Sequence, residues 1–130
     1  MRVMIVGDLW PVLTGFDDRA TPLSVLREQA RLLGTKSSGK LMAELVTFPV
    51  GSDLRHAFEI VAPSLGGYRF QLFSITHPPE LYPMTAEIGG KTVLIRTEAE
   101  FETQLREVLS SDRTRKILAN LLSQVDALAA

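Results

Sequence analysis

The sequence predicts an α+β fold: one helix, then an antiparallel meander of about five strands, then two C-terminal helices packed on one face of the sheet. Two runs, His56–Ala62 and Tyr68–Thr76, alternate apolar and polar side chains around a short Pro63–Gly67 turn, as antiparallel strands do. Gly89-Gly90 predicts a second hairpin, because both central positions of a type I′ turn need positive φ.

The first helix is predicted over residues 21–34. Thr21 is a good N-cap, Pro22 suits the first helical position, and Gly34 stands where a helix would stop. Within residues 1–20, the apolar stretch Met1–Val6 predicts a short strand, and a loop follows it.

Residues 41–96 are predicted to form the sheet. Gly51-Ser52, Pro78-Pro79 and Gly89-Gly90 separate its apolar runs and mark its turns. The expected strands are Leu41–Phe48, His56–Ala62, Tyr68–Thr76, Tyr82–Ile88 and Lys91–Arg96.

Residues 97–128 are predicted to form two helices. Thr97 and Glu100 have the spacing of a capping box, and Ser110-Ser111 interrupts the helical pattern. The second helix, from Asp112 to Leu128, carries a wide apolar stripe. This stripe either packs entirely on the sheet or is shared between the sheet and a partner helix.

The central hairpin predicts which side chains share a face of the sheet. A turn over Pro63–Gly67 places Phe58 opposite Leu72, which gathers the aromatic residues of both strands on one face. In this register His56 shares the face of Phe58, and His77 falls on the other face.

The second face of the sheet is expected to carry an apolar patch. Either the N-terminal segment of the chain, with Trp10, covers this patch, or another protein or a second copy of the chain does. The residues expected in the patch are Val46, Phe48, Ala57, Phe73 and Ile75, of which Val46, Phe48, Phe73 and Ile75 are the interface candidates.

Composition limits the classes of function. A length of 130 residues fits a single domain, and a net charge of −1 gives no electrostatic reason to expect nucleic acid or an anionic membrane as a partner. The chain has no cysteine, which excludes disulfides, thiolate metal sites and cysteine catalysis. No apolar run approaches the ~20 residues that span a bilayer. We therefore expect a soluble, untargeted, cytoplasmic protein.

One stretch resembles a nucleotide-binding motif in spacing alone. Gly34–Leu41 has the glycine and lysine positions of a P-loop, but Leu41 stands where Ser or Thr would hold magnesium. A P-loop also joins a strand to a helix, whereas here a helix precedes the stretch and a strand follows it. We therefore interpret it as a polar connector.

The two histidines and a nearby carboxylate are the residue types of a metal site. His56, His77 and Glu80 would supply two imidazoles and one carboxylate, but the register places the histidines on opposite faces. We therefore predict no metal and no cofactor.

His77, Glu80 and Tyr82 are the candidate binding residues. They could form a small acid–base cluster at the end of the sheet, where loops on a rigid scaffold often carry sites. The structural alternative is that Pro78-Pro79 enforces an extended turn and Tyr82 packs. No nucleophile or set of oxyanion donors accompanies the cluster, so the structural interpretation is favoured.

Two functions follow from these observations. The first is a non-enzymatic interaction or accessory module, either a homodimer or a subunit of a larger assembly, because the chain lacks a complete catalytic set. The alternative is a small ligand-binding protein or enzyme with its site near His77, Glu80 and Tyr82.

Overall fold

A computed structural model describes residues 6–15 and 20–129 and confirms the predicted α+β architecture. The five strands form one open antiparallel sheet in the order β1-β2-β3-β4-β5. The elements are α1 (Pro22–Lys36), β1 (Met42–Val50), β2 (Asp53–Ala62), β3 (Tyr68–His77), β4 (Met84–Ile88), β5 (Lys91–Ile95), α2 (Glu98–Ser110) and α3 (Asp112–Ala129).

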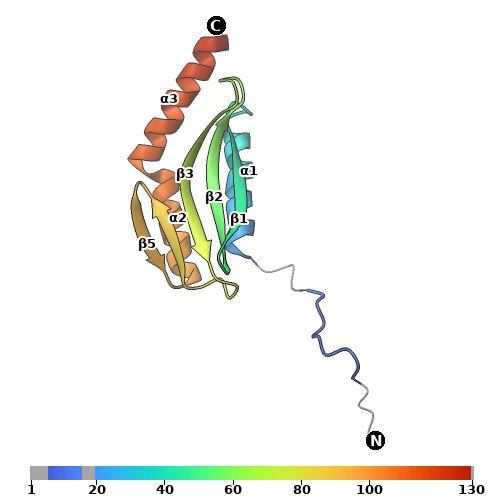
Figure 1. The fold of residues 1–130 in the computed structure, drawn as a ribbon. Coiled ribbons are helices and arrows are strands. Elements are labelled where there is room, and N and C mark those ends of the chain that lie inside the picture. Colours follow the sequence, from blue (N-terminus) through green and yellow to red (C-terminus); the bar gives the residue numbers. More distant parts are fainter. Residues whose placement is uncertain (1–5, 16–19, 130) are drawn as a thin grey trace, which may run out of the picture.

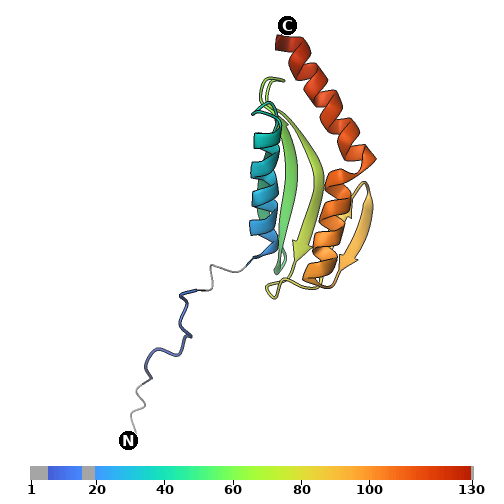
Figure 2. The same ribbon diagram turned by 180° about the vertical axis from the view of Figure 1, so that it is seen from behind.

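All three helices lie on the same face of the sheet (Figures 1 and 2). α1 packs behind β1, and α2 lies behind the β4–β5 hairpin. The hydrophobic core fills the space between this face and the helices, and it includes Leu26, Phe58, Ile60, Phe73, Ile75, Phe101, Leu105 and Leu121. We call the other side of the sheet the open face, because none of the described helices covers it.

The first helix begins where the sequence predicts and ends later. Thr21 Oγ1 accepts a hydrogen bond from the N–H of Ser24, while Ser24 Oγ accepts one from the N–H of Thr21. The helix continues past Gly34, because Ser38 (φ 54°) and Gly39 (φ 77°) make the left-handed turn instead, and the Gly39 N–H donates to the Gly34 carbonyl at 2.8 Å. The stretch with P-loop spacing is therefore a helix C-cap.

The turns of the sheet follow the predicted glycines. Gly89 and Gly90 both have positive φ, as a type I′ hairpin requires. The β1–β2 turn is shorter than expected and contains only Gly51 and Ser52, so Pro49 lies inside β1. Its position is consistent with an edge strand, where a proline removes no ladder hydrogen bond if its nitrogen points outward.

A β-bulge in β3 changes the register of the central hairpin. Ile60 lies opposite Phe70, as predicted, but Phe58 lies opposite Phe73 and not Leu72, so Leu72 has no partner in the ladder. Beyond the bulge the faces of β3 are exchanged relative to the prediction, and His56 lies opposite Ile75. The bulge allows both Leu72 and Phe73 to be buried.

The C-terminal helices are capped as the sequence indicates. Thr97 Oγ1 accepts the N–H of Glu100 at 3.1 Å, and the Glu100 carboxylate reaches back to the N–H of Arg96 at 2.7 Å. Extended backbone at Ser111 separates α2 from α3.

The strand expected at Met1–Val6 lies outside the described residues except for Val6, which is in no strand. None of the helices in residues 20–129 is long and apolar enough to cross a membrane.

Candidate functional site

The structure places the three candidate binding residues at the β3–β4 connection without joining them. His77 ends β3 and is buried, and its Nδ1–H donates to the Pro78 carbonyl at 2.8 Å. Glu80 is exposed in a tight turn, and Tyr82 is half-buried against the core. Burial, and then the nearby Glu98 carboxylate, raises the pKa of Tyr82. The structure shows no hydrogen bond among these three described side chains.

His77 instead meets the other histidine. Its Nε2 lies 2.9 Å from Nε2 of His56, and His56 Nδ1 lies 2.8 Å from Thr47 Oγ1. The expectation that the two histidines lie on opposite faces is therefore wrong, because the bulge at Leu72 turns the end of β3 over.

The hydrogen-bond directions in this network are fixed by its ends. The Pro78 carbonyl can only accept, so His77 Nδ1 carries a proton. In the neutral pair His77 Nε2 accepts from His56 Nε2–H, and Thr47 Oγ1–H donates to His56 Nδ1. Burial first, and then the neighbouring His77, lowers the pKa of His56. Every polar ring atom is thus satisfied in the uncharged state.

This geometry suits a structural link better than a metal site. Both Nδ1 atoms already have partners, and the two Nε2 atoms face each other at hydrogen-bond distance. Within the described residues there is no group of three or more His, Asp or Glu side chains that could hold a metal ion.

The open face carries an apolar patch on β1 alone. We define the β1 patch as Met42, Val46, Phe48 and Val50, which are each 38% to 46% exposed. Arg55 packs over the Phe48 ring, with its guanidinium carbon 5.9 Å from the centroid, and its Nε donates to Thr76 Oγ1.

The two other interface candidates are not on this patch. Phe73 and Ile75 are buried on the helix-covered face, so the prediction that they belong to the exposed patch is wrong. The cause is again the bulge, which reverses the alternation of β3 after Leu72. The sequence contains its signal: the apolar doublet Leu72-Phe73, after which the apolar residues fall on odd positions.

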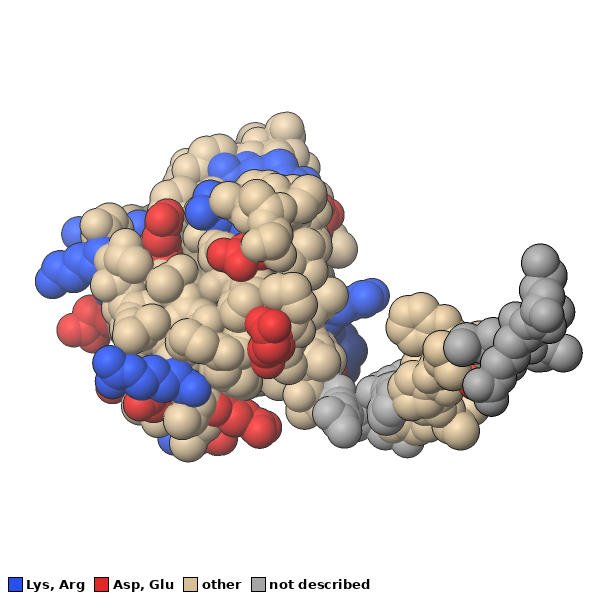
Figure 3. Space-filling view, turned by 60° about the horizontal axis from the view of Figure 1, so that its bottom comes forward, with Lys and Arg blue, Asp and Glu red and all other residues tan. Residues whose placement is uncertain are grey.

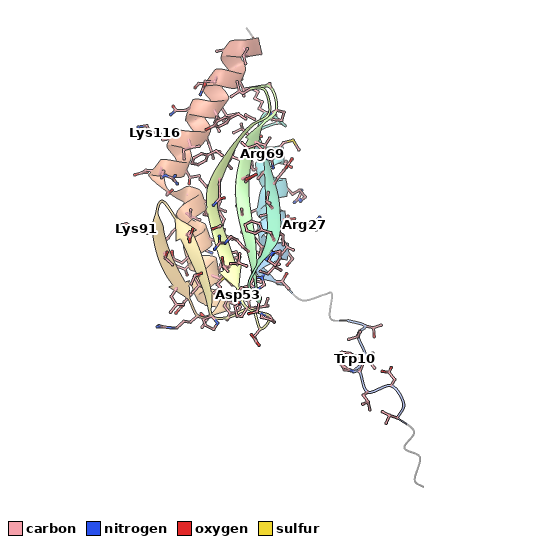
Figure 4. The ribbon with its side chains drawn as sticks, viewed as in Figure 1. Trp10, Arg27, Asp53, Arg69, Lys91 and Lys116 are labelled. Carbon is pink, nitrogen blue, oxygen red and sulfur yellow. The ribbon has the colours of Figure 1, made fainter. Side chains whose placement is uncertain are left out.

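Residues 6–15, the described part of the N-terminal segment, do not cover the patch. Leu9 and Trp10 are more than three-quarters exposed, and Trp10 lies far from the sheet in Figure 4. Val3 and Ile5, which were expected to help cover it, lie outside the described residues.

An ion cluster lies beside the patch on the open face. Arg69 on β3 binds the carboxylates of Glu59 on β2, at 2.9 Å, and of Glu44 on β1. These hydrogen bonds raise the pKa of Arg69 further above its usual range. The cluster ties three strands together, and because one guanidinium is shared by two carboxylates it carries a net charge of −1.

No described strand pairs with the outer edge of β1. Val50 and Asp53 close a two-residue turn as a hydrogen-bonded pair, so the alternation along the ladder points the N–H groups of Ala43, Leu45 and Thr47 away from β2. The β5 edge has only five residues. An unpaired edge of nine residues is a template for another strand.

A cavity opens along this same edge. We call it the edge cavity; it has a volume of about 600 Å³ and lies between α1 and β1. Its lining combines apolar and polar side chains, with Arg27 and Arg31 among them. Arg31 is paired with Glu28, whereas Arg27 forms no ion pair with the described residues. The lining includes Leu23, Arg27, Ala30, Ala43, Leu45 and Thr47.

Comparisons with known proteins do not name a function: no family model, no curated protein and no solved structure matches this chain.

Proposed function

We propose that this protein is a non-enzymatic interaction module that binds an extended polypeptide segment as an added strand on the edge of β1. The observation that carries the proposal is the coincidence of an unpaired strand edge with a cavity beneath it. In strand addition, main-chain hydrogen bonds supply affinity, and pockets for alternate side chains supply specificity.

The two sides of the edge favour one kind of segment. Side chains pointing toward α1 would enter the edge cavity, and side chains pointing the other way would lie against the β1 patch. The β1 patch is apolar, and the edge cavity combines apolar side chains with that of Arg27, which is labelled beyond β1 in Figure 4. The favoured ligand therefore has apolar residues on both faces and one acidic residue directed toward α1.

Selection of random linear peptides on the immobilised full chain tests this proposal. We expect enriched peptides with apolar residues on both faces, and slower hydrogen exchange of the Ala43, Leu45 and Thr47 amides when such a peptide binds. Ala43→Pro removes one outward donor and should weaken binding at least about tenfold.

The matched control is Thr92→Pro on the other edge of the sheet. Thr92 is the outward-facing neighbour of the Ile88–Lys91 closing pair, so this proline leaves both the β1 edge and the edge cavity intact. Equal loss of binding in both variants, or protection of amides elsewhere, would contradict the proposal.

A further inference from the structure

The N-terminal arm, defined as residues 6–15, exposes a run of large apolar side chains. In Figures 1 and 3 it stands clear of the body of the molecule. Exposed apolar surface of this kind marks an interaction site. Leu9, Trp10, Val12 and Leu13 are each 66% to 83% exposed.

We propose that the N-terminal arm of one copy of this chain is the strand that adds to the β1 edge of a second copy. This inference rests on the proposed function and names its partner. Reciprocal exchange of two arms gives a closed two-fold dimer in which each site is incomplete without the other chain.

Pro11 selects the face that each arm residue occupies. Because Pro11 has no N–H, its nitrogen must point away from β1, so the N–H groups of Asp8, Trp10 and Val12 point toward it. In an antiparallel ladder, residues on hydrogen-bonded positions share a face with the residues opposite them. Here these are Ala43, Leu45 and Thr47, whose side chains line the edge cavity.

One antiparallel register then places arm residues against both the edge cavity and the β1 patch. With Trp10 opposite Leu45, the indole enters the edge cavity and Asp8 lies opposite Thr47, beside the unpaired Arg27. On the open face the same register sets Leu9 against Val46. The hydrogen bond from the Trp10 N–H to Asp8 Oδ1 is replaced by the ladder.

A further contact of this register extends the apolar match along the edge. Leu13 falls opposite Met42, so the second leucine of the arm also meets a member of the β1 patch. Pro11 falls opposite Glu44, whose carboxylate is already bound by Arg69.

An antiparallel strand on its own chain would leave the arm almost no residues for the connection to α1. In the antiparallel register Leu13 lies beside Met42, at the far end of β1 from the start of α1 (Figures 1 and 2). The eight peptide units to Thr21 span about 27 Å when extended, and the return along β1 takes about 23 Å, which leaves almost nothing for the turn.

A parallel strand on the same chain is excluded by handedness. It would run into α1, which would then cross over to β1. Figures 1 and 2 show α1 behind the sheet and β1 at its edge. β1 would then lie between the added strand and the rest of the sheet, and a crossover through α1 in that order is left-handed. Parallel crossovers are right-handed in about 98% of cases.

Disulfide trapping in the full chain tests the register and the exchange together. The chain has no cysteine, so Leu9→Cys with Val46→Cys introduces the sole pair of thiols. Directly opposed residues on non-hydrogen-bonded positions are close enough for a disulfide. We expect a covalent dimer on mild oxidation. Leu9→Cys with Val50→Cys, displaced by four residues, is the matched control and should cross-link much less.

Trp10 provides a second measurement, because it is the only tryptophan of the chain. Its emission should shift to the blue as the concentration rises, in parallel with dimer formation in sedimentation. Leu9→Asp and Ala43→Pro should each weaken the dimer roughly ten- to hundredfold. Mixing the two variants should restore one exchanged arm, because each supplies the part that the other lacks.

Three results would overturn the inference: an intrachain disulfide, equal cross-linking of the displaced pair, or a monomer at all concentrations with an exposed Trp10. If selected peptides still protect the β1 amides in that monomer, the proposed function stands and the arm is not its ligand. If no peptide binds either, both the proposed function and the exchange of arms are wrong.

Discussion

Strands β1 and β3 contain phenylalanines that look alike in the sequence and have opposite environments in the structure. Phe48 on β1 is 40% exposed, whereas Phe73 on β3 is 3% exposed and stacks on Phe58 with a centroid distance of 5.1 Å. β3 lies between two strands and Phe73 is on the helix-covered face, while β1 has one neighbouring strand and Phe48 is on the open face. Apolar content alone therefore does not decide burial; the position and phase of the strand do.

Truncating these two phenylalanines should give the largest difference in stability between the two strands. Phe73→Ala removes a buried ring from the core and should lower the free energy of unfolding by about 3–5 kcal/mol. Phe48→Ala should lower it by less than about 1 kcal/mol, because the ring is already partly in water. Urea denaturation of both variants measures the difference. Similar losses of stability in the two variants would contradict the expected difference between Phe73 and Phe48.

The comparison also shows which features could be predicted from sequence. The caps at Thr21 and Thr97 and the turn at Gly89-Gly90 are local, so a few residues suffice to predict them. The bulge at Leu72 depends on the pairing of β3 with its neighbouring strands and not on local residues alone. A prediction that assumed strict alternation along β3 therefore placed Phe73 on the wrong face.

The candidate site was only partly accessible from sequence for the same reason. Val46 and Phe48 lie on the open face and are each 40% exposed, and their role as interface residues stays a prediction. The free edge and the cavity under it depend on the strand order and on where α1 packs, which no local pattern encodes. The contact between His56 and His77 required the bulge.

The histidine network connects the two strands, since it runs from the exposed Thr47 on β1 through the buried His56 on β2 to the buried His77 on β3. His56 has a pKa below its ordinary value of 6.5 in the folded protein. Above that pH the ring is neutral in both states, and the network contributes its full stability. As the pH falls through 6.5 the unfolded chain binds the proton first, so stability decreases.

We therefore expect the free energy of unfolding to decrease below neutral pH by at most about 1.4 kcal/mol per pH unit for this one proton. His56→Gln removes the titrating group and should flatten this dependence, while lowering stability at neutral pH by about 1–3 kcal/mol because Thr47 and His77 lose a ring partner. Denaturant titrations at several pH values measure both effects. An unchanged slope in the variant would show that His56 is not the responsible group.

The ion cluster is the exposed counterpart of that connection, and we expect it to matter least for stability. Arg69 joins Glu44 on β1 and Glu59 on β2 across the open face, but its side chain is 42% exposed. Exposed ion pairs contribute about 0–1 kcal/mol, because water and salt screen the charges. Arg69→Gln should therefore lower the urea midpoint only slightly, and the difference from the unaltered chain should shrink at high salt. A larger, salt-independent loss would mean that β1 is held to β3 through the open face as firmly as through the buried histidines.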